Sequence, residues 1–200
     1  MSLDLEISKS KSISQWLDGA IHGIEFERST RSMLAAACFD SVGEIHKGVV
    51  VLLYDRLNAP AFALARPAFE TYLRGVWLSH SASEADLGRF QRDKIDPTIQ
   101  QVITSIEKIA QFSDGVLSRV KAAGFDVMSS YTHGGFYQIS RRIGPDFIEP
   151  HYAEEEQVEI LRATTSYSLL SAIEIANLAQ NEALAESVLQ QIIEYAHIKA

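Results

Sequence analysis

Apolar side chains recur every three to four positions along three long stretches of the chain, the spacing that places them on one face of an α-helix. The stretches cover residues 30–57, 59–80 and 154–179. Only Asn58 separates the first two, and so short a connection places consecutive helices antiparallel. No strand signal extends beyond four residues. We therefore predict an all-α fold, a helical bundle built on this antiparallel hairpin and the long third helix.

The weaker patterns at the two ends of the chain predict shorter elements. We expect residues 1–10 to be frayed, because regular apolar spacing starts only after Ser12. A helical piece in the middle of the chain is expected to end at Gly124, since glycine suits the position just beyond a helix. Residues 181–200 are predicted to form a helix that is peripheral or makes dimer contacts. No linker divides the sequence, so we expect one all-helical domain over residues 1–200.

A narrow line of charge interrupts the apolar surface of the second stretch. Arg66, Glu70 and Arg74 follow one another at four-residue steps and fall, with Trp77, within an arc of about 80° on a helix. We call the three charged residues the seam. Pro67 lies inside the same helix, where it removes a backbone donor and displaces the carbonyl one turn earlier. We therefore predict a kink near Arg66 and a carbonyl that needs a new hydrogen-bond donor.

Two interpretations of the seam remain open at this stage. In the first, Glu70 pairs with both arginines in a buried ion-pair ladder that orients helices without any chemistry. In the second, the seam lines a pocket, and its net positive charge receives an anion. Planar guanidinium groups suit phosphate or carboxylate better than lysine does.

A second cluster of polar residues lies in the segment Ser129–Gln138. It contains several hydroxyls, His133 and two glycines, with Tyr131 two positions before the histidine. The simpler interpretation is a capped helix junction closed by a glycine turn. The alternative is a ligand site, since glycines let the backbone approach a ligand and histidine changes protonation near neutral pH.

Known catalytic and metal-binding patterns are missing from the sequence. It has no P-loop, no dinucleotide-binding glycine motif and no nucleophile elbow. The Glu-x-x-His pattern that a di-iron bundle needs twice occurs once, at Glu194 and His197. We therefore expect no metal and no cofactor.

The net charge of −8 argues against general nucleic-acid binding and against binding to an anionic membrane. The longest apolar run, residues 49–54, is too short to cross a bilayer, and the first ten residues lack the apolar core of a signal peptide. The single cysteine, Cys38, lies on an apolar helical stripe, which is typical of a reduced, buried thiol. These features predict a soluble, cytoplasmic protein.

The two polar clusters together resemble the signatures of a bacterial all-helical family of unknown function. The first signature is Arg-Pro-x-x-Glu-x-x-x-Arg-Gly-x-Trp, here starting at Arg66, and the second is Tyr-x-His-Gly, here starting at Tyr131. The resemblance extends over about residues 34–179. It implies an all-helical fold and a soluble bacterial protein, and it suggests that the two clusters meet in space. It implies no activity.

A second, shorter pattern is similar to the Arg-x(4–6)-His motif of HEPN ribonucleases of toxin and antiphage systems. Arg74 and His80 have this spacing. A glycine follows the arginine where those enzymes usually have a polar residue, and a six-residue step puts the two side chains on opposite sides of a helix.

Three functional hypotheses follow. The first is a pocket for a small anionic ligand between the seam and residues 129–138. The second is a metal-independent ribonuclease that uses Arg74 with His80 or His133, and the third is a homo-oligomeric interaction protein that dimerises through its last helix. The candidate ligand-binding residues are Arg66, Glu70, Arg74, Trp77, Tyr131, His133 and Gln138.

Overall fold

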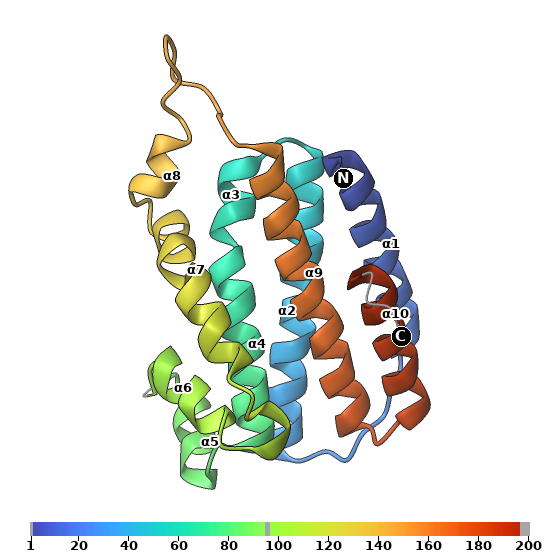
Figure 1. The fold of residues 1–200 in the computed structure, drawn as a ribbon. Coiled ribbons are helices and arrows are strands. Elements are labelled where there is room, and N and C mark those ends of the chain that lie inside the picture. Colours follow the sequence, from blue (N-terminus) through green and yellow to red (C-terminus); the bar gives the residue numbers. More distant parts are fainter. Residues whose placement is uncertain (1, 95–96, 197–200) are drawn as a thin grey trace.

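The computed structural model describes residues 2–94 and 97–196, and in these residues every regular element is a helix apart from one isolated bridge (Figure 1). The elements are α1 (Leu3–Ile21), α2 (Thr30–Tyr54), α3 (Asn58–Ala63), α4 (Ala65–His80), α5 (Glu84–Phe90), α6 (Ile99–Ile106), a 3-10 turn η1 (Ala110–Phe112), α7 (Val116–Thr132), α8 (Phe136–Ser140), α9 (Glu154–Leu178) and α10 (Glu182–Ala196). The predicted all-α bundle is therefore confirmed. No helix in the described residues is long and apolar enough to cross a membrane.

The predicted antiparallel hairpin forms the centre of the bundle. α2 runs in one direction, and α3 and α4 return beside it (Figure 1). Gly75 lets α4 approach α2 closely, because a Cβ atom at this position would lie only 2.5 Å from the ring of Phe39. Phe39 itself is 1% exposed, so the close approach belongs to the hydrophobic core.

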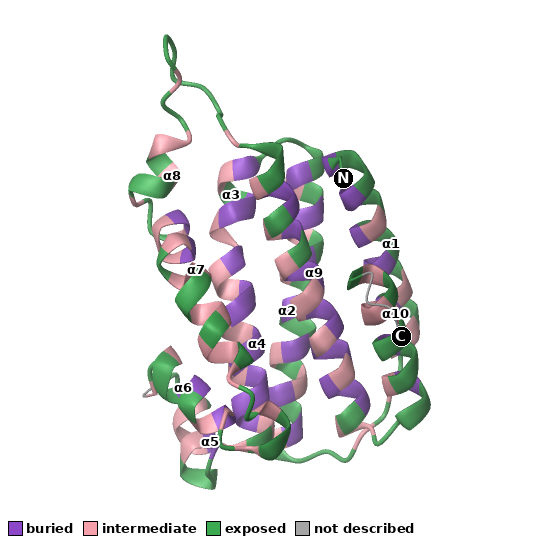
Figure 2. Cartoon of the chain, viewed as in Figure 1, coloured by how far each residue is buried: buried purple, intermediate pink, exposed green. Residues whose placement is uncertain are grey.

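The long helix α9 packs against α1, α2, α4 and α10, as the third apolar stretch predicts. The faces that these helices turn toward one another are buried, and the outer faces are exposed (Figure 2). α10 occupies the outer edge beside α1, where Leu184 and Val188 are buried. Asn181 caps it by accepting from the backbone N–H of Leu184 at 3.0 Å. His197, part of the single Glu-x-x-His pattern, lies outside the described residues.

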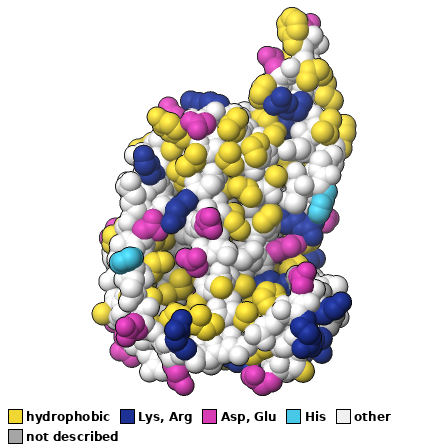
Figure 3. Space-filling model, turned by 180° about the vertical axis from the view of Figure 1, so that it is seen from behind, with side chains coloured by type: hydrophobic (Ala, Val, Ile, Leu, Met, Phe, Trp, Pro, Cys, Tyr) yellow, Lys and Arg dark blue, Asp and Glu magenta, His cyan; other side chains and the backbone are white. Residues whose placement is uncertain are grey.

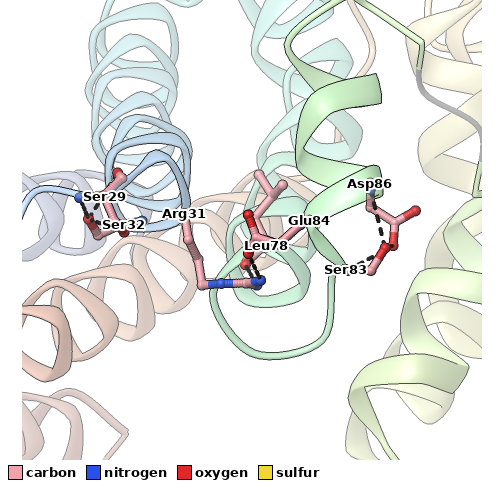
Figure 4. Close-up of polar contacts among 7 residues, drawn as sticks. All are labelled: Ser29, Arg31, Ser32, Leu78, Ser83, Glu84 and Asp86. Atoms are coloured by element: carbon pink, nitrogen blue, oxygen red, sulfur yellow. Dashed lines mark hydrogen bonds and ion pairs between the residues drawn. The ribbon is translucent and has the colours of Figure 1, made fainter.

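Polar contacts tie the start of α2 to the end of α4 (Figure 4). Ser29 and Ser32 form a capping box at the start of α2. The adjacent Arg31 donates to the carbonyl of Leu78 at 2.8 Å and to the carboxylate of Glu84 at 2.9 Å. These bonds fix the end of the hairpin opposite its turn.

The prediction that residues 1–10 are frayed is wrong. α1 begins at Leu3, and Leu3 and Ile7 are buried. Glu6 is 1% exposed and accepts hydrogen bonds from Arg162 of α9 and Tyr195 of α10. Because these partners are distant in sequence, the local apolar pattern gives no sign of them.

The prediction that a helix ends at Gly124 is also wrong, because α7 continues through it to Thr132. A glycine inside a helix costs about 1 kcal/mol relative to alanine. The packing of Val120 before this glycine, and of Phe125 and Met128 after it, against the core outweighs that cost. Thr132 and the residues before it therefore belong to one long helix, α7.

Candidate functional site

The seam and His133 meet where α7 packs against α4. Arg66 donates from Nε to Glu70 Oε1 at 2.7 Å, and its Nη1 lies 2.8 Å from Nε2 of His133. Arginine only donates hydrogen bonds, so Nε2 of His133 is the acceptor and the imidazole is neutral in this contact. The suggestion that the two clusters meet in space therefore holds for this pair.

Two further residues of α7 complete the surroundings of Arg66. The guanidinium carbon of Arg66 lies 4.7 Å from the centroid of the Phe125 ring, and Lys121 Nζ lies 5.3 Å from the same centroid. The two cations are therefore within about 10 Å of each other. We call Arg66, Glu70, Lys121, Phe125 and His133 the α4–α7 cluster. Basic, acidic and histidine side chains gather along this edge of the molecule (Figure 3).

Lys121 and Phe125 are absent from the residues that the sequence singled out. They follow a four-residue step, Lys121, Phe125, Ser129 and His133, that mirrors the seam on α4. The expected helix end at Gly124 concealed this step, because it placed Lys121 and His133 in separate elements.

The end of α7 holds His133 in place. His133 is the C-cap residue directly after α7, its N–H donates to the carbonyl of Ser129, and Gly134 follows with φ of 65°. The left-handed conformation at Gly134 ends the helix. Ser130 then accepts from the N–H of Tyr137 at the start of α8. Locally, the segment is the capped helix junction with a glycine turn that the simpler interpretation predicts.

Thr132 links this junction to the proline of the seam. The helix is interrupted at Leu64, two residues before the position that we predicted, because the ring of Pro67 displaces the carbonyl of Ala63. The hydroxyl of Thr132 donates to that carbonyl at 3.0 Å. The adjacent His133 is thereby held close to Arg66.

Arg74 lies in different surroundings from Arg66. Its Nη2 donates to the carbonyl of Pro97 at 3.0 Å, and its guanidinium carbon lies 6.0 Å from the ring of Trp77, which is buried. Burial lowers the pKa of Arg74, and the nearby carboxylate of Glu70 opposes this change. Glu70 bonds to Arg66 and not to Arg74, so half of the expected ion-pair ladder is present.

Tyr131 and Gln138 face a third region, beside α3. The Tyr131 ring packs edge-on against Phe62 at 4.9 Å between centroids. Gln138 donates to the carbonyl of Ala59 at 3.0 Å and accepts from the hydroxyl of Tyr152 at 3.4 Å. These contacts attach α8 and the end of α7 to the bundle.

The Arg74–His80 pair of the ribonuclease hypothesis has separate partners. Nε2 of His80 lies 2.7 Å from Glu174, whose side chain is buried on α9. Arg74 instead contacts Pro97, next to the start of α6. The contacts of the two side chains therefore give no sign of a shared substrate.

The described part of the chain contains no group of three or more His, Cys, Asp and Glu side chains that could hold a metal ion. Burial raises the pKa of the Cys38 thiol to about 11, which disfavours the reactive thiolate. The polar chemistry of the α4–α7 cluster therefore comes from cations, a carboxylate and an imidazole.

Comparison with known protein families supports the family that the two sequence signatures indicate. The model of DUF6988, a family of unknown function, matches residues 39–198, and the chain belongs to this family. No curated protein and no solved structure matches the chain. The expected membership in a family of unknown function is confirmed, and the match includes α10, which lay beyond the expected range.

Proposed function

We propose that this member of DUF6988 binds a small phosphate- or carboxylate-bearing ligand at Arg66 and His133. The observation that carries the proposal is the 2.8 Å contact between Arg66 Nη1 and His133 Nε2, which joins the two signatures at an exposed position. Most other signature residues have a structural contact that accounts for them. Gly75 permits the close approach of α2, and Arg74 bonds to a backbone carbonyl.

The guanidinium of Arg66 keeps donors for a ligand. Of its five N–H bonds, the contacts with Glu70 and His133 use two, and three remain. Its side chain is 23% exposed, so a ligand can reach these donors from solvent. Glu70 and the ring of Phe125 hold the guanidinium in one orientation, which reduces the entropy that binding would cost.

His133 can change its role when an anion arrives. In the free protein its Nε2 accepts from Arg66, which leaves the ring proton on Nδ1. If an anionic oxygen takes the hydrogen bond of Arg66, the ring can present a proton on Nε2 instead and donate to the same ligand. Lys121 adds a second positive charge beside Phe125.

The cluster suits a small anion better than a nucleic acid. It offers two cations and one carboxylate over a short distance, whereas nucleic-acid binding needs a continuous basic surface. The net charge of −8 also disfavours binding to nucleic acid. Phosphate and carboxylate each present a pair of oxygens that can accept two parallel N–H hydrogen bonds from a guanidinium.

The test is isothermal titration of inorganic phosphate, and separately of acetate, into the full chain. We expect binding in the wild type and at least a tenfold weaker affinity in Arg66→Gln and in His133→Gln. Arg89→Gln is the matched control, since Arg89 is also paired with a carboxylate on its own helix but lies on α5. It should leave affinity unchanged.

Two results would overturn the proposal. One is that neither phosphate nor acetate gives binding heat at millimolar concentration, while Arg66→Gln lowers the free energy of unfolding. The contact between Arg66 and His133 would then serve the fold alone. The other is cleavage of RNA in the presence of a chelator that is lost in His80→Asn, which would favour the ribonuclease hypothesis.

A further inference from the structure

A protruding segment extends beyond the end of the bundle between α8 and α9 (Figure 1). Residues 141–151 form a short hairpin, closed by hydrogen bonds from Gly144 to Phe147 and from Glu149 to Arg142, both at 3.0 Å. An ion pair between Arg141 and Glu156 attaches the base of this hairpin to α9. We call α8 and this hairpin, residues 136–151, the arm.

The arm exposes an unusual amount of apolar surface. Six of its large apolar side chains are exposed, and Phe147 and Ile148 at the tip are 74% and 77% exposed. The six are Phe136, Tyr137, Ile139, Ile143, Phe147 and Ile148. Soluble monomers rarely leave contiguous apolar patches of more than a few hundred Å² uncovered.

A complementary surface lies on the opposite side of the bundle, between α1 and α2. There a groove of about 530 Å³ is lined by Ile7, Val50, Val51 and Tyr54 on its apolar side. Val51 and Tyr54 are 57% and 72% exposed. The face seen from behind in Figure 3 carries apolar side chains over this region.

We propose that the arm of one copy packs into the α1–α2 groove of a second copy, and that the exchange is reciprocal. The groove, of about 530 Å³, has room for the two apolar side chains at the tip of the arm, Phe147 and Ile148.

The groove of the same chain is not accessible to the arm. The arm leaves the bundle after α7, returns at the start of α9 and points away from the helices, whereas α1 lies at the edge of the bundle opposite α7 (Figure 1). A second copy brings arm and groove together without any rearrangement of the helices. A two-fold arrangement also uses both surfaces of each copy, which closes the assembly.

Charge favours the same pairing. Two acidic residues at the groove already have partners, Asp4 with Arg56 and Asp18 with Lys47. Lys11, which also lines the groove, has none in the described part of the chain. The arm carries Asp146 and Glu149 near its tip, so Lys11 can pair with an acidic residue of the incoming copy.

The test is sedimentation velocity of the full chain between 1 and 100 µM. We expect a wild-type dimer, and a dissociation constant at least 100-fold higher in an arm variant (Phe147→Asp with Ile148→Asp) and in a groove variant (Val51→Asp with Tyr54→Asp). The four side chains are exposed, so the helical fold should persist, and circular dichroism checks this. The control is Leu189→Asp, an equally drastic change at an exposed residue of α10.

Mixing the two variants gives the sharpest result. Neither variant alone can form an intact contact, but a heterodimer keeps one, between the arm of the groove variant and the groove of the arm variant. Recovery of a dimer in the mixture supports the proposal. A monomeric wild type at 100 µM, a groove variant that stays dimeric, or a mixture that stays monomeric would overturn it. Loss of the dimer only in Leu189→Asp would assign dimerisation to α10 instead.

Discussion

Acidification is expected to destabilise the bundle through one buried histidine. His46 on α2 is fully buried, and its Nδ1 lies 3.2 Å from the hydroxyl of Thr164 on α9. The same hydroxyl lies 3.1 Å from the carbonyl oxygen of Leu161, to which it donates. Burial lowers the pKa of His46 from its ordinary value of 6.5 to about 4, because an imidazolium in this position would lose its hydration.

The sign and the size of the effect follow from the two pKa values. Between pH 6.5 and pH 4 the unfolded chain binds a proton at His46 that the folded chain excludes, so stability falls as the pH falls through this window. Well above pH 6.5, His46 is neutral in both the folded and the unfolded chain, so it does not change the free energy of unfolding with pH. Lowering the pH from 7.5 to 5 should cost about 2 kcal/mol from His46 alone.

Urea unfolding at a series of pH values measures this loss. His46→Gln keeps an amide donor for Thr164 but does not titrate, so the difference between wild type and variant isolates the histidine. The exposed His22 provides the control, and His22→Gln should retain the wild-type slope. Equal slopes in wild type and His46→Gln between pH 7.5 and 5 would refute the reasoning.

Three substitutions test the packing that positions the α4–α7 cluster, each by urea unfolding. Thr132→Val removes the donor to the carbonyl of Ala63 and should cost about 1–2 kcal/mol; no loss would mean that the hydroxyl donates to the carbonyl of Met128, also at 3.0 Å, and not to Ala63. Gly75→Ala drives a Cβ atom into the ring of Phe39 and should cost about 1–3 kcal/mol, despite the helix preference of alanine. Gly124→Ala makes the same change inside α7, where there is room, and should stabilise the protein by up to about 1 kcal/mol. If Gly75→Ala and Gly124→Ala both stabilise or both destabilise the protein, the contacts assigned to these two glycines are wrong.

The helical core could be predicted from the sequence because its signal is local. The apolar spacing of 30–57, 59–80 and 154–179 gives α2, α3 with α4, and α9 with ends correct to within a few residues. The start of α1 could not be predicted, because Glu6 is stabilised by Arg162 and Tyr195, more than 150 residues away in the sequence.

The candidate site could be predicted only in part, for a similar reason. The four-residue step of the seam is visible on one helix, and it singles out Arg66 and Glu70, which form an ion pair in the structure. Whether Arg74 turns toward Glu70 or toward Pro97 depends on where the start of α6 packs, which no local pattern specifies. Lys121 and Phe125 were missed because Gly124 suggested a helix end that tertiary packing overrides.

The most direct test of the central claim is nitrogen-15 NMR of the histidine side chains during titration with inorganic phosphate. If Arg66 and His133 form the binding site, Nε2 of His133 should shift from an unprotonated to a protonated nitrogen signal as phosphate binds, and the buried His46 should not respond. The same titration of Arg66→Gln should leave His133 unchanged. A His133 signal that does not respond to phosphate in the wild type would contradict the account.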